Sequence, residues 1–407
     1  MDFKKNIAFK IALFFLTLTA FFTLFRSSMA GIFSLFYSKA GISDAEISSI
    51  KSFQNIGILI GLLPSGYLSD KIGRLKVLVF SSLVISFSFL LLLLFKNHIS
   101  FSCAEFIYGI GLALNSGTLL SYITELQENY NLSPNKKLMS YQVIILNLTT
   151  LIGGNIGTWL FSYKITLPIY FAMIGLLIYP VLTILLAKSM KFSDNKKNTK
   201  NNDTFESKII TFKHGINFVQ KKDFWILLLL NVGFDCGTQF LLIYWPIIYV
   251  DNLKFDLSFV YTLFMVSNIL GSTIFNKLSS ILTSKGLVLF NTCSMVILFI
   301  SSGLIVNRYL QLISFLFIEL LMGIISGQIT AESNEAIYGE KSKSFMLSTV
   351  SFLTEIIVSL SLLLNDKIIQ ETKNIKIMFF VSALYFLILL FILPMVKKND
   401  RYLYSKS

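Results

Sequence analysis

The chain has 407 residues, of which 54% are hydrophobic and only 14% are charged. A soluble protein could not cover that much apolar surface with polar groups, so the composition excludes an ordinary globular protein and predicts one that crosses a membrane several times. In a soluble protein the net charge of +13 would favour nucleic-acid binding. Here the basic residues gather in the loops of one face, so the charge indicates the orientation of the chain in a membrane. We therefore expect no nucleic-acid partner.

Apolar runs separated by charged or Asn- and Gly-rich turns predict an all-α membrane protein with twelve transmembrane helices. A span needs about 20 apolar residues, so twelve spans and their loops use nearly the whole length. The predicted helices lie near residues 7–37, 47–69, 75–95, 100–125, 139–163, 166–188, 223–250, 257–280, 285–306, 309–332, 343–364 and 375–396.

The distribution of Lys and Arg predicts the orientation of these helices. With the N-terminus placed inside, most of the 35 basic residues fall in loops of the inner face. Cytoplasmic loops carry such an excess, so we expect both termini in the cytoplasm. The Lys-, Asn- and Ile-rich composition suits a multi-pass protein of a bacterial plasma (inner) membrane.

A charged hinge separates the second and third predicted helices. It reads Gly66-Tyr67-Leu68-Ser69-Asp70-Lys71-Ile72-Gly73-Arg74-Leu75-Lys76, with Pro64 just upstream. The glycines permit a tight turn, and the charged cluster can form a salt-bridged latch. This stretch resembles the loop between helices 2 and 3 of major facilitator superfamily (MFS) transporters, which has the pattern G-x-L-[AS]-D-[RK]-x-G-R-[RK]. Within that superfamily, the chain resembles the drug:proton antiporters.

The resemblance implies two six-helix bundles around a central cavity, with alternating access by rocking of the halves. The N-terminal bundle would span 1–190, a cytoplasmic loop 191–222, and the C-terminal bundle 223–407. It also implies a monomer in the lipid bilayer that moves a small-molecule substrate together with protons. We expect no cofactor.

Charged residues inside predicted spans are costly, so each is a candidate for function. The first two are Arg26 in helix 1 and Glu105 in helix 4. Many family members carry R-x-x-x-G-x-G in helix 4, and here Glu105 begins that frame where the family has Arg. We therefore predict that Arg26 supplies the positive charge and pairs with Glu105, either as a coupling switch or as a fixed structural ion pair.

The C-terminal half contributes three acidic candidates for proton or cation binding. Asp235 lies deep in helix 7, in a polar segment interrupted by glycines, as a substrate-lining segment should be. Aligning Tyr37 with Tyr249 places it opposite Thr23, one turn from the Arg26 position. Glu319 in helix 10 and Glu355 in helix 11 are alternatives, each of which could instead be a hydrogen-bonded helix contact.

Two matches between the halves indicate an internal repeat. Helix 4 contains Glu105 and Gly109, and helix 10 contains Glu319 and Gly323, both in the pattern E-x-x-x-G. Nearer the cytoplasmic ends, each half has a Ser-Gly pair followed by a glutamate, and these glutamates are Glu125 and Glu335. We expect both to join Gly66, Asp70, Gly73 and Arg74 in a network that gates the inner opening.

Neither cysteines nor nucleophile pairs indicate an enzyme. Cys103, Cys236 and Cys293 lie in apolar runs without nearby His, so we expect buried packing residues and neither a disulfide nor a metal site. No Ser/His pair, metal-ligand cluster or phosphate loop has usable spacing.

The candidate charges sum to one positive and four negative, which favours protons and cationic or neutral amphiphiles over anions. The first hypothesis is a proton-coupled exporter of hydrophobic or cationic small molecules. The alternative is proton-coupled uptake of a sugar, organic acid or other metabolite, with Arg26 as an anion clamp. A third is a membrane sensor that transports nothing.

Proton-antiport exporters of the family usually carry the motif G-P-x-x-G-G in helix 5. The corresponding stretch here, from Gly153 to Thr158, is glycine-rich but lacks the proline.

Overall fold

The computed structural model describes residues 2–116, 118–132, 136–192, 219–336 and 343–395. The chain divides into two compact units, Met1–Lys200 and Asn201–Ser407, called unit 1 and unit 2 below. Residues 193–218, which make up most of the predicted 191–222 connection, lie outside the described part. The described ranges contain helices and no strand.

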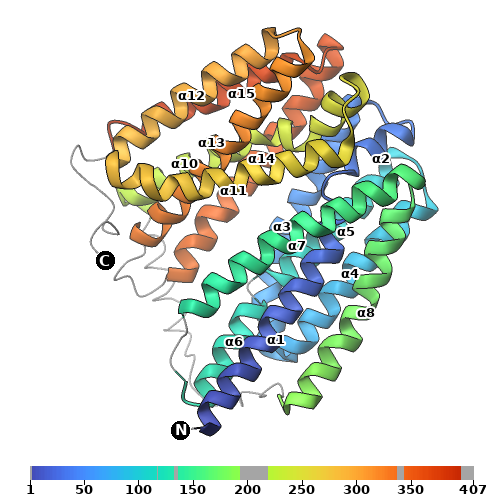
Figure 1. Cartoon of the computed structure of the whole chain (residues 1–407), viewed down its shortest axis with the longest axis vertical. Helices are drawn as coiled ribbons and strands as arrows, with labels where there is room; N and C mark the ends of the chain where they lie inside the picture. The colour runs from blue at the N-terminus through green and yellow to red at the C-terminus, as the bar shows by residue number, and fades with distance from the viewer. Residues whose placement is uncertain (1, 117, 133–135, 193–218, 337–342, 396–407) are drawn as a thin grey trace. The chain divides into compact units, whose positions relative to one another are not determined.

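Each unit is a bundle of long helices joined by short turns (Figure 1). The helices of unit 1 are α1 (Asp2–Ser27), α2 (Phe33–Lys39), α3 (Asp44–Ile72), α4 (Arg74–Leu94), α5 (His98–Asn115), α6 (Thr118–Asn129), α7 (Lys136–Tyr163) and α8 (Leu167–Met190). Those of unit 2 are α10 (Lys222–Pro246), the π-helix η1 (Ile247–Asn252), α11 (Leu257–Ile281), α12 (Ser284–Leu304), α13 (Arg308–Ala336), α14 (Lys343–Thr372), α15 (Ile377–Leu387) and the 3-10 helix η2 (Ile388–Ile392).

Every predicted span corresponds to helical chain, but four of the spans are not single α-helices, and the last of these passes from α15 into the 3-10 helix η2. The first is broken between α1 and α2, where Met29 N–H donates to Arg26 O and Ala30 N–H to Ser27 O in tight turns. The fourth is divided into α5 and α6 next to Ser116, whose extended ψ of 121° ends α5. The seventh changes from α10 to the π-helix η1 at Pro246, because a proline lacks the N–H that continues an α-helix.

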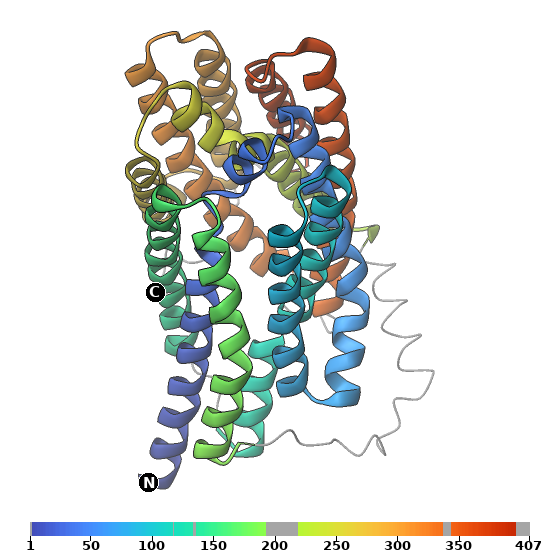
Figure 2. The same ribbon diagram turned by 90° about the vertical axis from the view of Figure 1, so that its right-hand side faces the viewer.

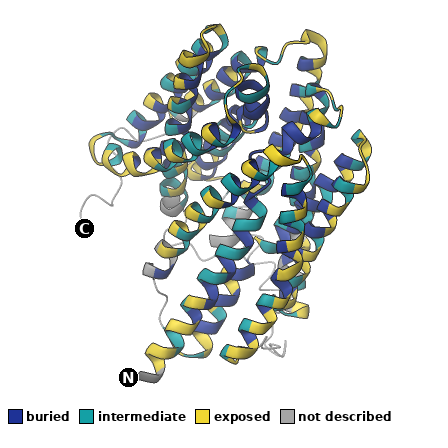
Figure 3. Ribbon diagram, turned by 45° about the vertical axis from the view of Figure 1, so that its right-hand side comes forward, coloured by how far each residue is buried: buried dark blue, intermediate teal, exposed yellow. Residues whose placement is uncertain are grey.

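Nine helices among the described residues are long and apolar enough to cross a membrane. The other three predicted spans correspond to α3 and α14, which are long but more polar, and to α15, a shorter apolar helix. The count of twelve spans therefore stays a prediction. Figure 3 shows buried and exposed faces alternating along the helices, and the exposed faces carry large apolar side chains such as Phe9, Trp159 and Leu185. Such faces suit contact with lipid.

The glycine-rich part of α7 packs directly against the end of α1. A Cβ on Gly153 would lie 2.2 Å from the Leu24 carbonyl oxygen, and one on Gly157 would lie 1.8 Å from that of Ser28. The two backbones can approach this closely only because glycine has no side chain. The helices α1, α7 and α8 lie side by side in unit 1 (Figure 2).

The same kind of contact joins α3 to α5 in unit 1 and α11 to α13 in unit 2. A Cβ on Gly109 would lie 2.1 Å from the Gln54 carbonyl oxygen. The corresponding distance from Gly323 to the Asn268 carbonyl oxygen is 2.2 Å. These contacts fix how the two helices of each pair are rotated about their axes. Glu105 and Glu319, each one turn before the glycine, are thereby turned towards the partner helix.

The burial predicted for the cysteines is wrong at two positions. Cys236 is buried in α10, but Cys103 and Cys293 are exposed. Both of these lie on the outer faces of apolar helices, where a small apolar side chain is compatible with lipid as well as with a protein interior.

Candidate functional site

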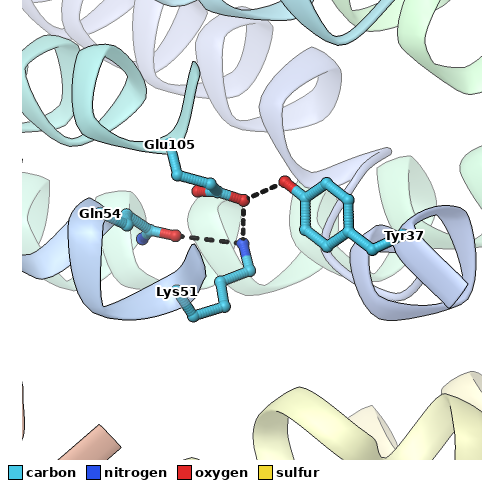
Figure 4. A network of polar contacts seen from close by, with 4 residues as sticks. All are labelled: Tyr37, Lys51, Gln54 and Glu105. Carbon is cyan, nitrogen blue, oxygen red and sulfur yellow. Dashed lines mark hydrogen bonds and ion pairs between the residues drawn. The ribbon is translucent and has the colours of Figure 1, made fainter. Parts of the chain in front are cut away.

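Glu105 of α5 is the centre of a buried polar network in unit 1 (Figure 4). Its side chain is 1% exposed, and Oε1 accepts a hydrogen bond from Lys51 Nζ at 2.5 Å. The hydroxyl of Tyr37, from α2, donates to the same oxygen. Lys51 Nζ also donates to Gln54 Oε1 at 3.2 Å, so one ammonium group joins the carboxylate of α5 to an amide one turn along its own helix, α3.

Aromatic rings complete the surroundings of this ammonium group. Lys51 Nζ lies 3.8 Å from the centre of the Phe33 ring and 5.9 Å from that of Tyr37. The Tyr37 ring in turn packs on Phe101, with ring centres 5.0 Å apart. Cation–π attraction therefore adds to the charge-assisted hydrogen bond, and the ammonium group of Lys51 is enclosed by its own chain.

The predicted partner of Glu105 is wrong. Arg26, in the last turn of α1, lies against the hydroxyl of Tyr108, while Lys51 forms the ion pair with Glu105. Tyr108 also lies within electrostatic reach of Glu105. The glycine contact between α3 and α5 explains the difference, because it places α3 and its lysine nearest to the carboxylate.

Lys51 is the site residue that the sequence reasoning missed. It lies inside the predicted span 47–69 and is therefore a charged residue within a membrane span, as Arg26 and Glu105 are. Its spacing of three residues to Gln54 places the two side chains on one face of the helix. That spacing was a usable signal for the partner of Glu105.

Glu319 of α13 occupies the corresponding place in unit 2, and no basic side chain in the described part of the chain pairs with it. It is fully buried, and neither carboxylate oxygen makes a hydrogen bond of good geometry among the described residues. The Asn268 amide of α11 lies against it, and the Tyr249 hydroxyl of η1 is within electrostatic reach. That hydroxyl makes a long hydrogen bond to the Gln311 carbonyl oxygen, at 3.5 Å.

Asp235 of α10 and Glu355 of α14 form a second acidic group in unit 2. The two helices pack against each other, and each residue is half-buried. The two are close enough to interact electrostatically, and no ion pair neutralises either of them among the described residues. The structure thus brings together two residues that the sequence proposed as alternatives. Glu319 lies in the same unit but on a different helix.

The hinge between α3 and α4 contains an ion pair that crosses to α6. Arg74 begins α4, and its Nη1 lies 3.3 Å from Glu125 Oε2. The same nitrogen donates to the Ser121 carbonyl oxygen. Gly73 joins the helices with a φ of +100°, a conformation that side chains strongly disfavour.

Other members of the predicted gate are not described to the same extent. Gly66 and Asp70 belong to α3 and Glu335 to α13, but their side-chain surroundings lie outside the described part of the structure. In unit 2, the Ser284 hydroxyl of α12 donates to Glu332 of α13, three residues before Glu335 in the sequence. No group of three or more His, Cys, Asp or Glu side chains that could hold a metal occurs among the described residues.

Comparison with known proteins gives one family and several similar structures. Residues 15–356 match the family model of the Major Facilitator Superfamily. The crystal structure of the nucleoside transporter NupG is similar with a TM-score of 0.73 at 11% identity, over 96% of this chain and 100% of that chain. The crystal structure of an auto-inhibited POT family peptide transporter is similar with a TM-score of 0.74 at 14% identity, over 96% and 98%. These identities show the fold alone, and no curated protein sequence matches the chain.

Proposed function

This chain belongs to the Major Facilitator Superfamily of transporters, and from that premise we propose that it is a proton-coupled exporter of hydrophobic or cationic small molecules. It would work by alternating access between two bundles, residues 1–190 and 223–407, joined by the 191–222 segment. We place it as a monomer in a plasma membrane, with both termini in the cytoplasm.

The observation that carries the proposal is the acidic character of the unpaired charges in unit 2. Asp235 and Glu355 are half-buried and interact with each other, and Glu319 is buried with no cationic partner among the described residues. Carboxyl groups without a basic partner accept either a proton or a cation, so binding of one can displace the other. In unit 1, by contrast, Glu105 is already paired with Lys51, and Arg26 is engaged with Tyr108.

We assign the roles accordingly. Asp235 and Glu355 bind the coupling proton, and Glu319 is the third acidic member of the transport site. Arg26 and Glu105 belong to the transport machinery of unit 1, where they hold the helices around them in place. Gly66, Asp70, Gly73, Arg74, Glu125 and Glu335 gate the cytoplasmic opening, a role supported by the Arg74–Glu125 ion pair. Uptake of an anionic metabolite is not favoured, because the unpaired carboxylates would repel it.

The test uses inverted membrane vesicles with an acidic interior, in which proton movement is followed with a pH-sensitive dye. A panel of lipophilic cations should dissipate the gradient with the native protein and not with Asp235→Asn. The matched control is Asp223→Asn, the same substitution at an exposed position of α10, which should behave like the native protein. If Asp235→Asn, present in the membrane at the normal amount, moves protons as well as the native protein, the assigned role of Asp235 is wrong.

A further inference from the structure

The site around Glu105 in unit 1 binds the ammonium group of Lys51, a residue of the same chain. It therefore shows which kind of ligand such a site accepts. Lys51 Nζ is held by Glu105 at 2.5 Å and by Gln54 at 3.2 Å, with the Phe33 ring 3.8 Å away. These three contacts supply a counter-charge, a polar acceptor and a π-face. Together they satisfy an alkylammonium ion in a buried place.

Unit 2 repeats the polar part of this site in the same register. A Cβ on Gly57 would meet the Phe106 carbonyl oxygen at 2.1 Å, and one on Gly271 would meet that of Leu320 at 1.9 Å. The Gln54–Gly109 and Asn268–Gly323 contacts match in the same way. In this register Glu319 replaces Glu105, and Asn268, another side-chain amide, replaces Gln54.

The aromatic part is repeated as well. Tyr249 packs on Phe315 with ring centres 4.4 Å apart, as Tyr37 packs on Phe101. Four residues before each tyrosine stands a second aromatic residue, Phe33 in unit 1 and Trp245 in unit 2. The Trp245 ring is stacked on Phe264, 5.9 Å away, and Trp is the side chain that attracts cations most strongly through its ring.

The lysine is the one part of the unit 1 site that has no counterpart at its register position. Met265 stands three residues before Asn268, as Lys51 stands three before Gln54. Glu319 consequently has no cationic partner among the described residues, although it is fully buried. A buried carboxylate in that state is costly, so the group needs either a proton or a cation from outside the chain. Met265 is half-buried, and a flexible methionine side chain can move aside to admit one.

We propose that Glu319, with Asn268, Tyr249 and Trp245, binds the ammonium group of an organic amine in the place that Lys51 occupies in unit 1. The inference rests on the proposed function in one respect, namely that this amine is the transported substrate. It narrows the substrate class from cations in general to compounds with an alkylammonium group next to an apolar body, since the group that fits the template is a primary ammonium on an aliphatic chain.

The experiment measures binding of benzylammonium to the purified full-length chain through the fluorescence of Trp245. The protein has three tryptophans, and Trp159 and Trp225 are exposed, so both are first changed to Phe. Benzylammonium should change the Trp245 emission with a saturable dependence on concentration. Benzyl alcohol, which has the same shape without the charge, should give no saturable change.

Two variants test the site directly. Glu319→Gln removes the counter-charge, and Met265→Lys supplies a tethered ammonium group that occupies the site as Lys51 does. Each should weaken benzylammonium binding by about tenfold or more, because a charge-assisted hydrogen bond is lost or blocked. Asn276→Lys, which adds the same charge at an exposed position of α11, should bind as the parent does. Melting temperature and elution volume show whether each variant is folded.

The outcomes separate this inference from the proposed function. Binding that both Glu319→Gln and Met265→Lys weaken supports the ammonium site, even if no proton movement is found in vesicles. If folded Met265→Lys protein binds benzylammonium as tightly as the parent, the inference is wrong, even where lipophilic cations still dissipate the proton gradient. Equal binding of benzyl alcohol would also overturn it, because the site would then recognise the ring and not the charge.

Discussion

Lys51 determines what Glu105 can do, because it neutralises a carboxylate that is only 1% exposed. The lysine side chain itself is 13% exposed, so most of the pair is removed from water. A buried ion pair adds little net stability compared with an apolar pair, but removal of one partner leaves an isolated charge. The pair thus acts chiefly to keep α3, α5 and α2 in one arrangement.

We therefore predict that Lys51→Met destabilises the protein by about 3–5 kcal/mol, because Glu105 loses its cation. The double variant Lys51→Met/Glu105→Gln should recover most of that loss, since no charge is left buried. Unfolding midpoints of the purified proteins in one detergent measure both effects. A single variant as stable as the native protein, or a double variant no better than the single one, would contradict this role.

At the scale of helices, two glycine contacts decide how α3 meets α5 and how α11 meets α13. Gly109 and Gly323 each lie against a backbone carbonyl oxygen of the partner helix, which cannot move without moving the helix. The polar sites one turn away depend on this approach, because a wider spacing would carry Glu105 away from Lys51.

Gly109→Ala should destabilise unit 1 by about 1–3 kcal/mol or more, because the added Cβ would lie 2.1 Å from Gln54 O. Gly323→Ala should do the same in unit 2, where the distance is 2.2 Å. Gly286→Ala is the matched control, since its nearest neighbour would be the Thr283 hydroxyl at 3.3 Å. Thermal unfolding of the three variants measures the effect, and equal midpoints would show that the helices separate easily.

The start of α3 is held by a capping box. Ser43 N–H donates to Glu46 Oε2 at 3.0 Å and the Ser43 hydroxyl donates to the same oxygen at 2.6 Å. These hydrogen bonds hold the pKa of Glu46 below its usual value of 4.5. A lowered pKa in the folded state means that the stabilisation is present above pH 4.5 and is lost as the pH falls through the lower value.

Glu46→Ala should therefore cost no more than about 1 kcal/mol near pH 7, because the group is partly exposed. The difference from the native protein should shrink steadily below about pH 4.5. Unfolding midpoints of both proteins between pH 3 and pH 7 measure it. A difference that stays constant over that range would show that the carboxylate does not stabilise the cap through its charge.

At the scale of the whole molecule, the two units carry different unpaired charges. Unit 1 contains Lys51 and Glu105 as a pair together with Arg26, whereas unit 2 contains Asp235, Glu319 and Glu355 without an ion pair among the described residues. An amine or a proton would therefore be attracted to unit 2 more than to unit 1.

Much of the fold could be predicted from the sequence, because hydropathy reports directly which segments avoid water. Each predicted span is helical in the structure, and the motif at 66–76 predicted the family. The break between α1 and α2 could not be predicted in the same way, since no proline stands there and the turn depends on packing against Gly157.

The partners within the site were predicted less well. Arg26 was expected to pair with Glu105, but a pairing depends on how helices are rotated about their axes, and that rotation is set by contacts such as Gly57 on Phe106. The acidic candidates lie within helices, as their apolar surroundings in the sequence predicted. Their chemical roles stay predictions, because a charge pattern indicates a site before it indicates what the site binds.

The most direct test of the central claim, proton-coupled export through an acidic unit 2, uses purified protein in liposomes with no other source of energy. Vesicles with an acidic interior should accumulate at least one member of a panel of lipophilic cations when they contain the native protein. Accumulation should disappear when the pH gradient is collapsed, and also with Asp235→Asn. If the native protein accumulates no cation of the panel under that gradient, or if accumulation persists without the gradient, the account is contradicted.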